Sequence, residues 1–262
     1  GVIGNANLRP EKTIQGELGL QQQISYNMAL DVTAYFRDIR DLAGTRSEEI
    51  TLFGGSATYN RLENSDFAYV RGLVLSLSMI ETNGFSASLD YTFQIAKGSA
   101  SDPQQARNAI AGGSLPEIQL TPLDWDQRNT VNMSLAYDRA NWGISGIGQF
   151  GSGLPYTPLS TEDISSLVLN SGKKPLTWNI DLKGYFIPRD GLRLFIRAEN
   201  IFDRLNPYTV YNDSGVADFT RWENIAKSQN TGEPINSISK WFLNETFYSN
   251  PRRIELGMIY VF

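Results

Sequence analysis

The side chains that carry out most enzyme chemistry are missing from this chain of 262 residues, which has no histidine and no cysteine. Without histidine there is no usual general base, no Ser-His-Asp arrangement and no common zinc or haem ligand. Without cysteine neither a disulfide nor a thiolate metal site can form. Two carboxylates could still do acid–base work, but no spacing marks such a pair. We therefore expect no enzyme, no resident cofactor and no bound metal.

The side chains best suited to binding are aromatic and lie in long segments rich in turn residues. Tyrosine and tryptophan rings offer faces on which a sugar or an aromatic chelator could stack, and an arginine could meet an anion. The candidate ligand-binding residues are Tyr156, Tyr208, Tyr211, Arg221, Trp222 and Trp241. The alternative is that these rings pack the loops against each other.

Residue spacing and net charge bear on two further kinds of binding, those of Ca²⁺ and of nucleic acid. The stretch "YNDSGVAD" groups Asn212, Asp213 and Asp218, whose oxygens could hold Ca²⁺. The spacing is not that of an EF-hand, and a plain turn closed by an Asn or Asp side chain is the favoured interpretation. The net charge of −5 argues against nucleic acid as a partner.

The elements that must position these residues are β-strands, because apolar residues recur at every second position. In "FSASLDYTFQIA" one face is apolar at six of six positions and the other is polar at five of six, which favours a strand over a helix. The pattern predicts nine long strands, at residues 13–22, 25–40, 66–80, 85–97, 126–139, 142–151, 177–187, 191–200 and 252–262. Residues 57–63 add a short strand or extend the third one.

The connections alternate in length. Short turns are expected at 21–25, 81–84, 138–141 and 188–191, and long loops at 41–65, 98–125, 152–176 and 201–251. Such an order describes an up-and-down antiparallel meander whose long loops all lie on one side.

The apolar face of this sheet meets either another sheet, as in a soluble β-sandwich, or lipid, as in a membrane barrel. Most of the strands reach the roughly 9–11 residues that a tilted transmembrane strand needs. The opposite face carries charges that suit a polar lumen. Strong lumen candidates are Arg193, Arg197, Glu199, Arg253 and Glu255, which could instead pair with one another across strands. We therefore expect a transmembrane antiparallel β-barrel surrounded by outer-membrane lipid.

One arginine does not fit this pattern. Arg71 has the lipid-facing parity of its strand. Either it lies near the outer rim, or a bulge at Gly72 resets the register.

The last strand, "SNPRRIELGMIYVF", ends on an aromatic residue preceded by alternating apolar residues. Bacterial outer-membrane proteins share such a strand. The resemblance implies that Met258, Tyr260 and Phe262 form the signal that the barrel-assembly machinery reads. The opening "GVIGNANLRPEK" has no signal peptide and looks like the middle of a loop, so we expect a fragment or a processed product.

Six segments in order resemble the C-terminal part of the barrel of a TonB-dependent receptor. They are "NANLRPEKTIQGELGLQ", "FAYVRGLVLSLS", "PLDWDQRNTVNMSLAY", "FGSGLPYTP", "RAENIFDRLNPYTVYNDSG" and the terminal strand. The third is similar to receptors with a carboxypeptidase-regulatory-like N-terminal extension. Val74 stands where the family usually has Glu, and Asn129 where it has His.

The resemblance implies that residues 1–262 are the last nine or so strands of a 22-stranded barrel, with the plug, the TonB-binding segment and strands 1–13 absent from this sequence. The implied function is TonB-coupled uptake across the bacterial outer membrane of a scarce nutrient, such as a metal chelate, an oligosaccharide or a peptide. A TonB complex would act through the missing part, the lumen charges would hold the plug, and a surface lipoprotein could cap the loops. The alternatives are a passive pore or adhesin barrel, and a soluble carbohydrate-binding β-protein.

Overall fold

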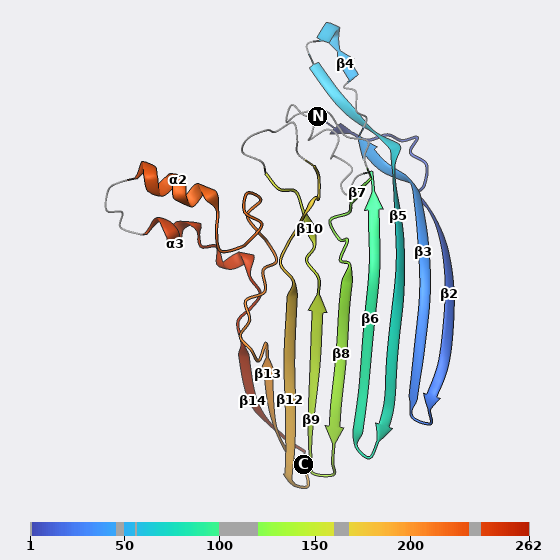
Figure 1. Cartoon of the computed structure of the whole chain (residues 1–262), viewed down its shortest axis with the longest axis vertical. Coiled ribbons are helices and arrows are strands. Elements are labelled where there is room, and N and C mark those ends of the chain that lie inside the picture. The colour runs from blue at the N-terminus through green and yellow to red at the C-terminus, as the bar shows by residue number, and fades with distance from the viewer. Residues whose placement is uncertain are drawn as a thin grey trace.

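The computed structural model describes residues 2–45, 50–55, 57–99, 120–159, 168–230 and 237–261. Nine long strands form one tall, curved sheet in which each pairs antiparallel with the next along the chain (Figure 1). From one edge to the other they are β2 (Lys12–Ser25), β3 (Met28–Thr45), β5 (Ala57–Thr82), β6 (Phe85–Gly98), β8 (Asn129–Asp138), β9 (Trp142–Gly151), β12 (Thr177–Arg189), β13 (Leu192–Glu199) and β14 (Arg253–Tyr260). These are the nine predicted strands, and the antiparallel meander is confirmed.

Shorter strands and helices lie at the long-loop end of the sheet (Figure 1). They are β1 (Val2–Ile3), β4 (Ile50–Leu52), η1 (Phe53–Gly55), β7 (Thr121–Pro122), β10 (Pro155–Tyr156), β11 (Gly172–Lys173), α2 (Arg221–Gln229), α3 (Ile238–Phe242) and η3 (Glu245–Phe247). Among the described residues, no helix has the length and apolar content needed to cross a membrane.

Strand pairing gives the sheet two unlike faces. Directly opposed residues share a face, and one row across seven strands is wholly apolar while the next row is wholly polar. The apolar row is Leu20, Val32, Leu75, Tyr91, Val131, Phe150 and Trp178. The polar row is Gln21, Asp31, Ser76, Asp90, Asn132, Gln149 and Asn179. The predicted parity therefore holds from strand to strand.

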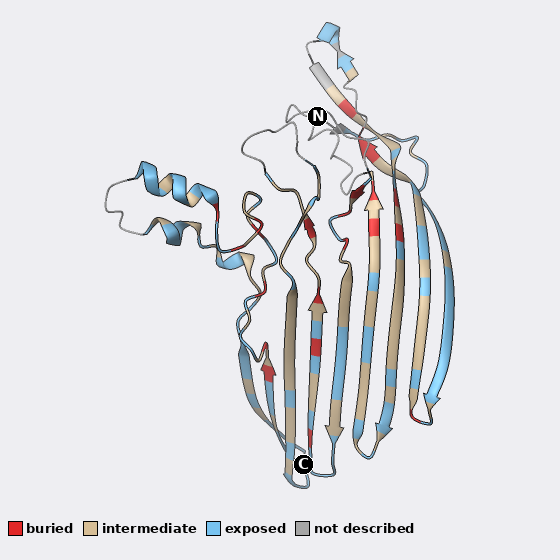
Figure 2. Cartoon of the chain, in the orientation of Figure 1, coloured by how far each residue is buried: buried red, intermediate tan, exposed pale blue. Residues whose placement is uncertain are grey.

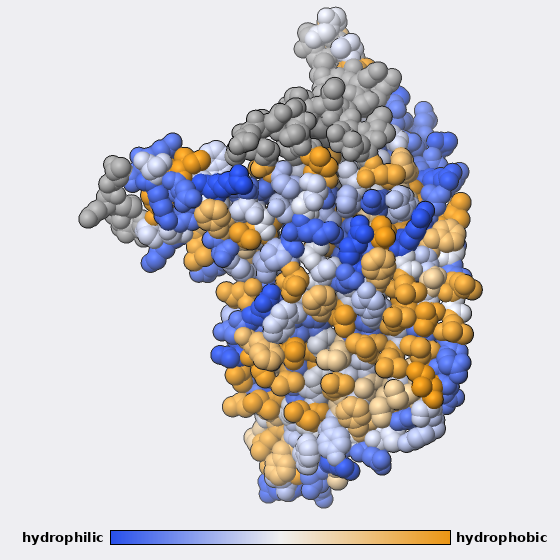
Figure 3. Space-filling model, viewed as in Figure 1, coloured by the Kyte–Doolittle hydropathy of each residue, from blue (hydrophilic) through white to orange (hydrophobic). Residues whose placement is uncertain are grey.

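No described element covers the apolar face, which we call the outward face. Leu18 and Leu256 on this face are each 79% exposed. The space-filling view shows the apolar side chains as a band across the strands, with hydrophilic zones above and below this band (Figure 3). A soluble sandwich would bury such a face against a second sheet.

The only cluster of buried apolar residues in the described part of the chain is small and lies on the other face, at the long-loop end of the sheet (Figure 2). It contains Ala68, Val70, Ala96 and Leu123. Most of the described strands therefore have no conventional core.

Three predicted boundaries are wrong. Residues 21–25 belong to β2, because the glutamines continue to pair with β3, and the turn is at Tyr26–Asn27. The expected loop 41–65 is largely strand in its described part, since β3 runs to Thr45 and β5 begins at Ala57. Residues 57–63 thus extend the third strand.

The third wrong boundary is the start of the strand predicted at 126–139, which begins at Asn129. Asp126 is fully buried, and its carboxylate accepts hydrogen bonds from the Ala96 backbone N–H and from Arg128 Nε, both at 2.7 Å. These bonds fold the chain inward before the strand starts.

No bulge is present at Gly72. The register of β5 against both neighbours runs without interruption through Arg71 and Gly72, so Arg71 lies on the outward face, opposite Phe36 and Ile95. It stands three residues below the upper end of β6, near the long-loop rim.

Candidate ligand-binding site

Two of the long loops meet above the sheet. The loop after β9 and the loop after β13 are joined by a hydrogen bond from the Leu159 N–H to the Asn212 carbonyl, at 2.9 Å. Asn170 ties the first of these loops to a third, since its Nδ2 donates to the Pro122 carbonyl at 2.8 Å and to Asp124 Oδ1 at 2.7 Å. Segments far apart in sequence thereby build one surface.

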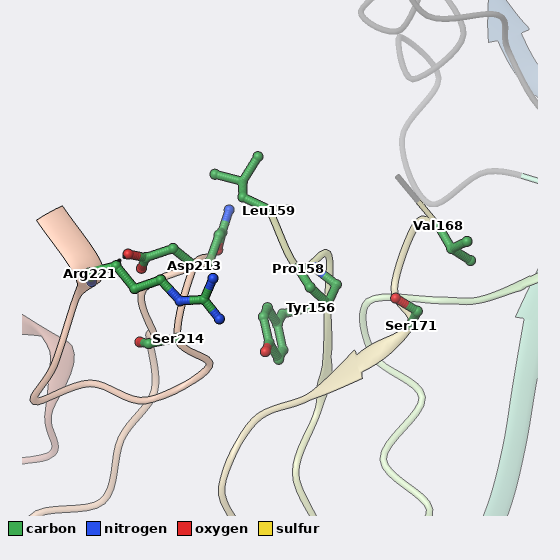
Figure 4. Close-up of a pocket in the computed structure, with 9 residues that line it drawn as sticks. Tyr156, Pro158, Leu159, Val168, Ser171, Asp213, Ser214 and Arg221 are labelled. Atoms are coloured by element: carbon green, nitrogen blue, oxygen red, sulfur yellow. Dashed lines mark hydrogen bonds between the residues drawn. The ribbon is translucent and has the colours of Figure 1, made fainter. Parts of the chain in front are cut away.

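A cavity of about 520 Å³ lies where the two loops meet (Figure 4). Its lining combines an arginine, a tyrosine, small polar groups and apolar side chains: Tyr156, Pro158, Leu159, Val168, Ser171, Asn212, Asp213, Ser214 and Arg221. Such a set suits a ligand that has both an anionic group and an apolar or aromatic part.

The first turn of α2 positions Arg221. Asp213 Oδ2 accepts hydrogen bonds from the Thr220 hydroxyl, at 2.8 Å, and from the Arg221 N–H, at 2.7 Å, and Thr220 caps the helix. The Arg221 side chain extends toward Tyr156 (Figure 4). Its guanidinium has no carboxylate partner among the described residues, so its charge is available to an anion.

Packing against two glycines holds Tyr156 in place. A Cβ on Gly172 would clash with Tyr156 Cε1, and a Cβ on Gly215 would clash with the Tyr156 hydroxyl. Gly215 also has a φ of 77°, which side-chain-bearing residues rarely adopt. The ring therefore packs between the two loops and lines the cavity.

Tyr211 and Tyr208 do not line this cavity. The Tyr211 hydroxyl donates to the Phe242 carbonyl, and its ring packs 5.0 Å from that of Phe247. Burial, followed by the charges of Asp213 and Glu223, raises the pKa of Tyr211 above its usual value. Tyr208 is exposed, and its carbonyl accepts a hydrogen bond from Lys174 Nζ at 3.0 Å. For Tyr211, the loop-packing alternative describes the structure.

Trp222 and Trp241 lie on the helical pair α2 and α3, which projects from the side of the sheet (Figure 1). They are 56% and 84% exposed, and neither lines the cavity. Of the six predicted ligand residues, the structure brings together only Tyr156 and Arg221.

The predicted lumen charges lie together on the polar face of β13 and β14. Arg197 pairs with Glu255 at 3.3 Å, Arg253 also pairs with Glu255, and Arg193 lies over the Tyr185 ring at 4.3 Å. Glu199 is the register partner of Arg253. Arg197 and Glu255 therefore form an ion pair across strands, Arg253 and Glu255 form one within β14, and contact with a plug stays a prediction.

Met258 and Tyr260 lie on the outward face of β14, opposite Leu194 and Leu192. Phe262 lies outside the described residues. The role of this strand as an assembly signal stays a prediction.

Sequence reasoning missed most of the cavity lining. Leu159, Val168 and Ser171 lie in an irregular loop, and no periodic pattern marks them. Asp213 was considered for Ca²⁺, but its carboxylate instead fixes the start of α2. Across the described ranges, no three His, Cys, Asp or Glu side chains gather as metal ligands would.

Comparisons with known proteins agree with this geometry. The family model described as "TonB dependent receptor-like, beta-barrel" matches residues 1–201. No curated protein matches the chain in sequence.

Solved structures show the same fold. FpvA of Pseudomonas aeruginosa, bound to a heterologous iron-loaded pyoverdine, is 12% identical, with 97% of this chain and 27% of that one covered and a TM-score of 0.60. The outer-membrane transporter YddB of Escherichia coli is 13% identical, covering 80% and 31%, with a TM-score of 0.60. The ferric-catecholate import receptor Fiu of E. coli K12 is 14% identical, covering 79% and 26%, with a TM-score of 0.54. At these identities the likeness concerns the fold, and the chain spans between a quarter and a third of each of these proteins.

Proposed function

Because the chain belongs to the TonB-dependent receptor β-barrel family of the outer membrane, we propose that the protein carrying it captures a scarce nutrient at its long loops and imports it by TonB-coupled transport. The observation that supports this most directly is the loop cavity in which Arg221 faces Tyr156 above a polar lumen face. The uncovered apolar band fits a sheet surrounded by lipid.

An anionic metal chelate fits the cavity better than a neutral oligosaccharide does, because the lining offers an arginine without a carboxylate partner among the described residues. The Arg221 guanidinium would bind an acidic oxygen, and Leu159, Val168 and Tyr156 would contact the organic part. FpvA and Fiu, which share the fold, are named for iron-chelate ligands, which favours this cargo class.

The remaining partners in the proposal follow from the family. A TonB complex would pull on a plug that the charges on β13 and β14 help to hold, and the barrel-assembly machinery would read β14. A surface lipoprotein, if one caps the loops, would contact the exposed Trp222 and Trp241 on the projecting helical pair. The carboxypeptidase-regulatory-like subgroup is part of the same proposal.

The first test is ligand binding by the complete receptor, purified from outer membranes in detergent, with ferric catecholates, ferric hydroxamates, oligosaccharides and peptides as probes. We expect a ferric chelate to bind. Arg221→Gln should raise the Kd of that chelate roughly ten- to a hundredfold, because a charge-assisted hydrogen bond is lost. Lys240→Gln is the matched control, since Lys240 is a cation of the same loop region that does not line the cavity. Equal loss in both variants would place the ligand elsewhere.

A second test separates energised uptake from the passive-pore alternative. Uptake of the bound chelate by cells should stop when TonB is deleted or the proton gradient is collapsed, while binding at the surface persists. Uptake that continues under both conditions would contradict TonB coupling and favour a pore.

A further inference from the structure

Cations gather on the outward face directly above the apolar band, on four neighbouring strands. The register places Lys12 opposite Arg40, Arg71 opposite Phe36, and Lys97 opposite Tyr69. Hydrophilic side chains border the apolar band at this level, over the upper parts of β3, β5 and β6 (Figure 3). The charges thus lie where an outward-facing side chain leaves the hydrocarbon region and meets lipid headgroups.

Two of the four cations are neutralised by neighbouring carboxylates. Arg40 donates from Nε and Nη2 to Asp38, at 3.0 and 2.7 Å, and Lys12 lies 3.9 Å from Asp41, which also pairs with Arg9. In the described ranges neither Arg71 nor Lys97 has a carboxylate partner. The patch therefore holds two uncompensated positive charges.

Arg71 and Lys97 are close enough to act on one anion. Arg71 is opposite Ile95, and Lys97 is two residues further along the same strand and face. Such diagonal neighbours lie about 7–8 Å apart, within reach of long side chains. The Arg71 guanidinium stacks over the Tyr69 ring at 5.2 Å, which keeps the charged group at the surface.

A cavity of about 670 Å³ adjoins these residues. Its lining includes the aromatic residues Phe36, Phe67 and Tyr69, the cation Arg71, the bonded pair Asp38 and Arg40, and the carboxylates of Asp41 and Asp66. The aromatic side walls, with Arg71 at the edge nearest the apolar band, suit a headgroup whose acyl chains continue down that band.

We propose that Arg71 and Lys97 bind the phosphate-bearing headgroup of a lipid in the outer leaflet. Arg71 would bind the phosphate oxygens through its planar guanidinium, and Lys97 would add a second charge from the adjoining strand. The site continues the lipid-facing surface and is separate from the loop cavity. The proposal therefore does not depend on which cargo binds in the loop cavity.

The opposite rim offers a matched control. Arg139 lies over the Tyr137 ring at 4.9 Å, and Arg189 lies over the Tyr260 ring at 5.8 Å. Both tyrosines are on the outward face at the short-turn end. These arginines reproduce the stacking of Arg71 on a tyrosine at the far edge of the band.

The experiment measures lipid A binding to the complete receptor in detergent by native mass spectrometry. We expect one bound lipid A per barrel, and about fivefold weaker binding for each charge removed, so roughly 25-fold for Arg71→Gln with Lys97→Gln. Arg139→Gln with Arg189→Gln should leave binding within about twofold of wild type. Arg71→Lys with Lys97→Arg should retain most of the affinity, and the heat-dependent gel shift of each variant reports whether its barrel is folded.

A second comparison needs no variant, because it tests two lipids on the wild-type receptor. Dephosphorylated lipid A should bind it about as weakly as lipid A binds the double glutamine variant. Equal affinity for the two lipids, or an equal loss of binding in the short-turn control, would overturn the proposal.

Discussion

At the scale of the residue, identical side chains have different roles that only their neighbours decide. Arg221 projects into a cavity without a carboxylate partner in the described residues, whereas Arg197 and Arg253 converge on Glu255. Tyr156 lines the cavity, whereas Tyr211 is bound to the Phe242 carbonyl. Only two of the six predicted residues line the cavity, because an aromatic ring in a loop can pack as well as bind, and the binding role of those two stays a prediction.

Asp126 gives a residue-scale prediction. It is fully buried and accepts hydrogen bonds from the Ala96 N–H and from Arg128, so Asp126→Ala leaves the Ala96 donor unsatisfied and the arginine without its partner. We expect a loss of about 1–3 kcal/mol in the free energy of unfolding. Urea unfolding of the complete receptor in detergent measures it, and a midpoint unchanged from wild type would contradict the structural role.

The control is Asp190→Ala. Asp190 lies exposed in the short turn before β13, where loss of a carboxylate should shift the unfolding midpoint little.

At the scale of the element, alternation determined nearly everything about the strands. All nine were predicted, because unlike faces impose a period of two along every strand. The errors fell at the ends, where Gln21, Gln22 and Gln23 look like a turn but pair with β3. The helices α2 and α3 were missed because short helices in a long loop carry too few residues to show a periodic pattern.

Adjacent residues of β5 supply an element-scale prediction. Leu75 faces outward in the apolar band, and Ser76 faces the polar side, where its hydroxyl bonds Asp90 at 2.6 Å. Leu75→Arg should destabilise the folded receptor in lipid by about 2–4 kcal/mol, because the charge must enter hydrocarbon. Ser76→Arg should cost much less, since the polar face accepts charge and Asp90 is adjacent.

The unfolding midpoint of the complete receptor in lipid vesicles compares these two variants directly. Equal effects, or the reverse order, would show that the face we call outward does not meet lipid.

At the scale of the whole molecule, the sheet is open in the described part of the chain, with β2 and β14 as its edges. An unpaired backbone group in lipid costs several kcal/mol, so such edges are not tolerated in a membrane. The solved structures that share this fold are three to four times longer than the share this chain covers. We therefore predict that further strands of the complete protein pair with both edges.

Hydrogen exchange in the complete receptor checks this whole-molecule prediction. Amides on the outer edges of β2 and β14 should exchange about as slowly as those of β9, which has a neighbour on each side. Fast exchange confined to the two edges would mean that no strands cover them, and a single closed barrel would then be ruled out.

The sequence by itself determined the strands, their two faces, the side on which the long loops lie and the membrane as the solvent of the apolar face. These properties are local and periodic, so they can be seen in a single segment. Only the tertiary structure decided that the loops after β9 and β13 meet, that Tyr156 faces Arg221, and that Arg71 lies beside Lys97 without a bulge. Those contacts join residues far apart in the chain, and their geometry depends on strand register and loop packing, which no short stretch of sequence encodes.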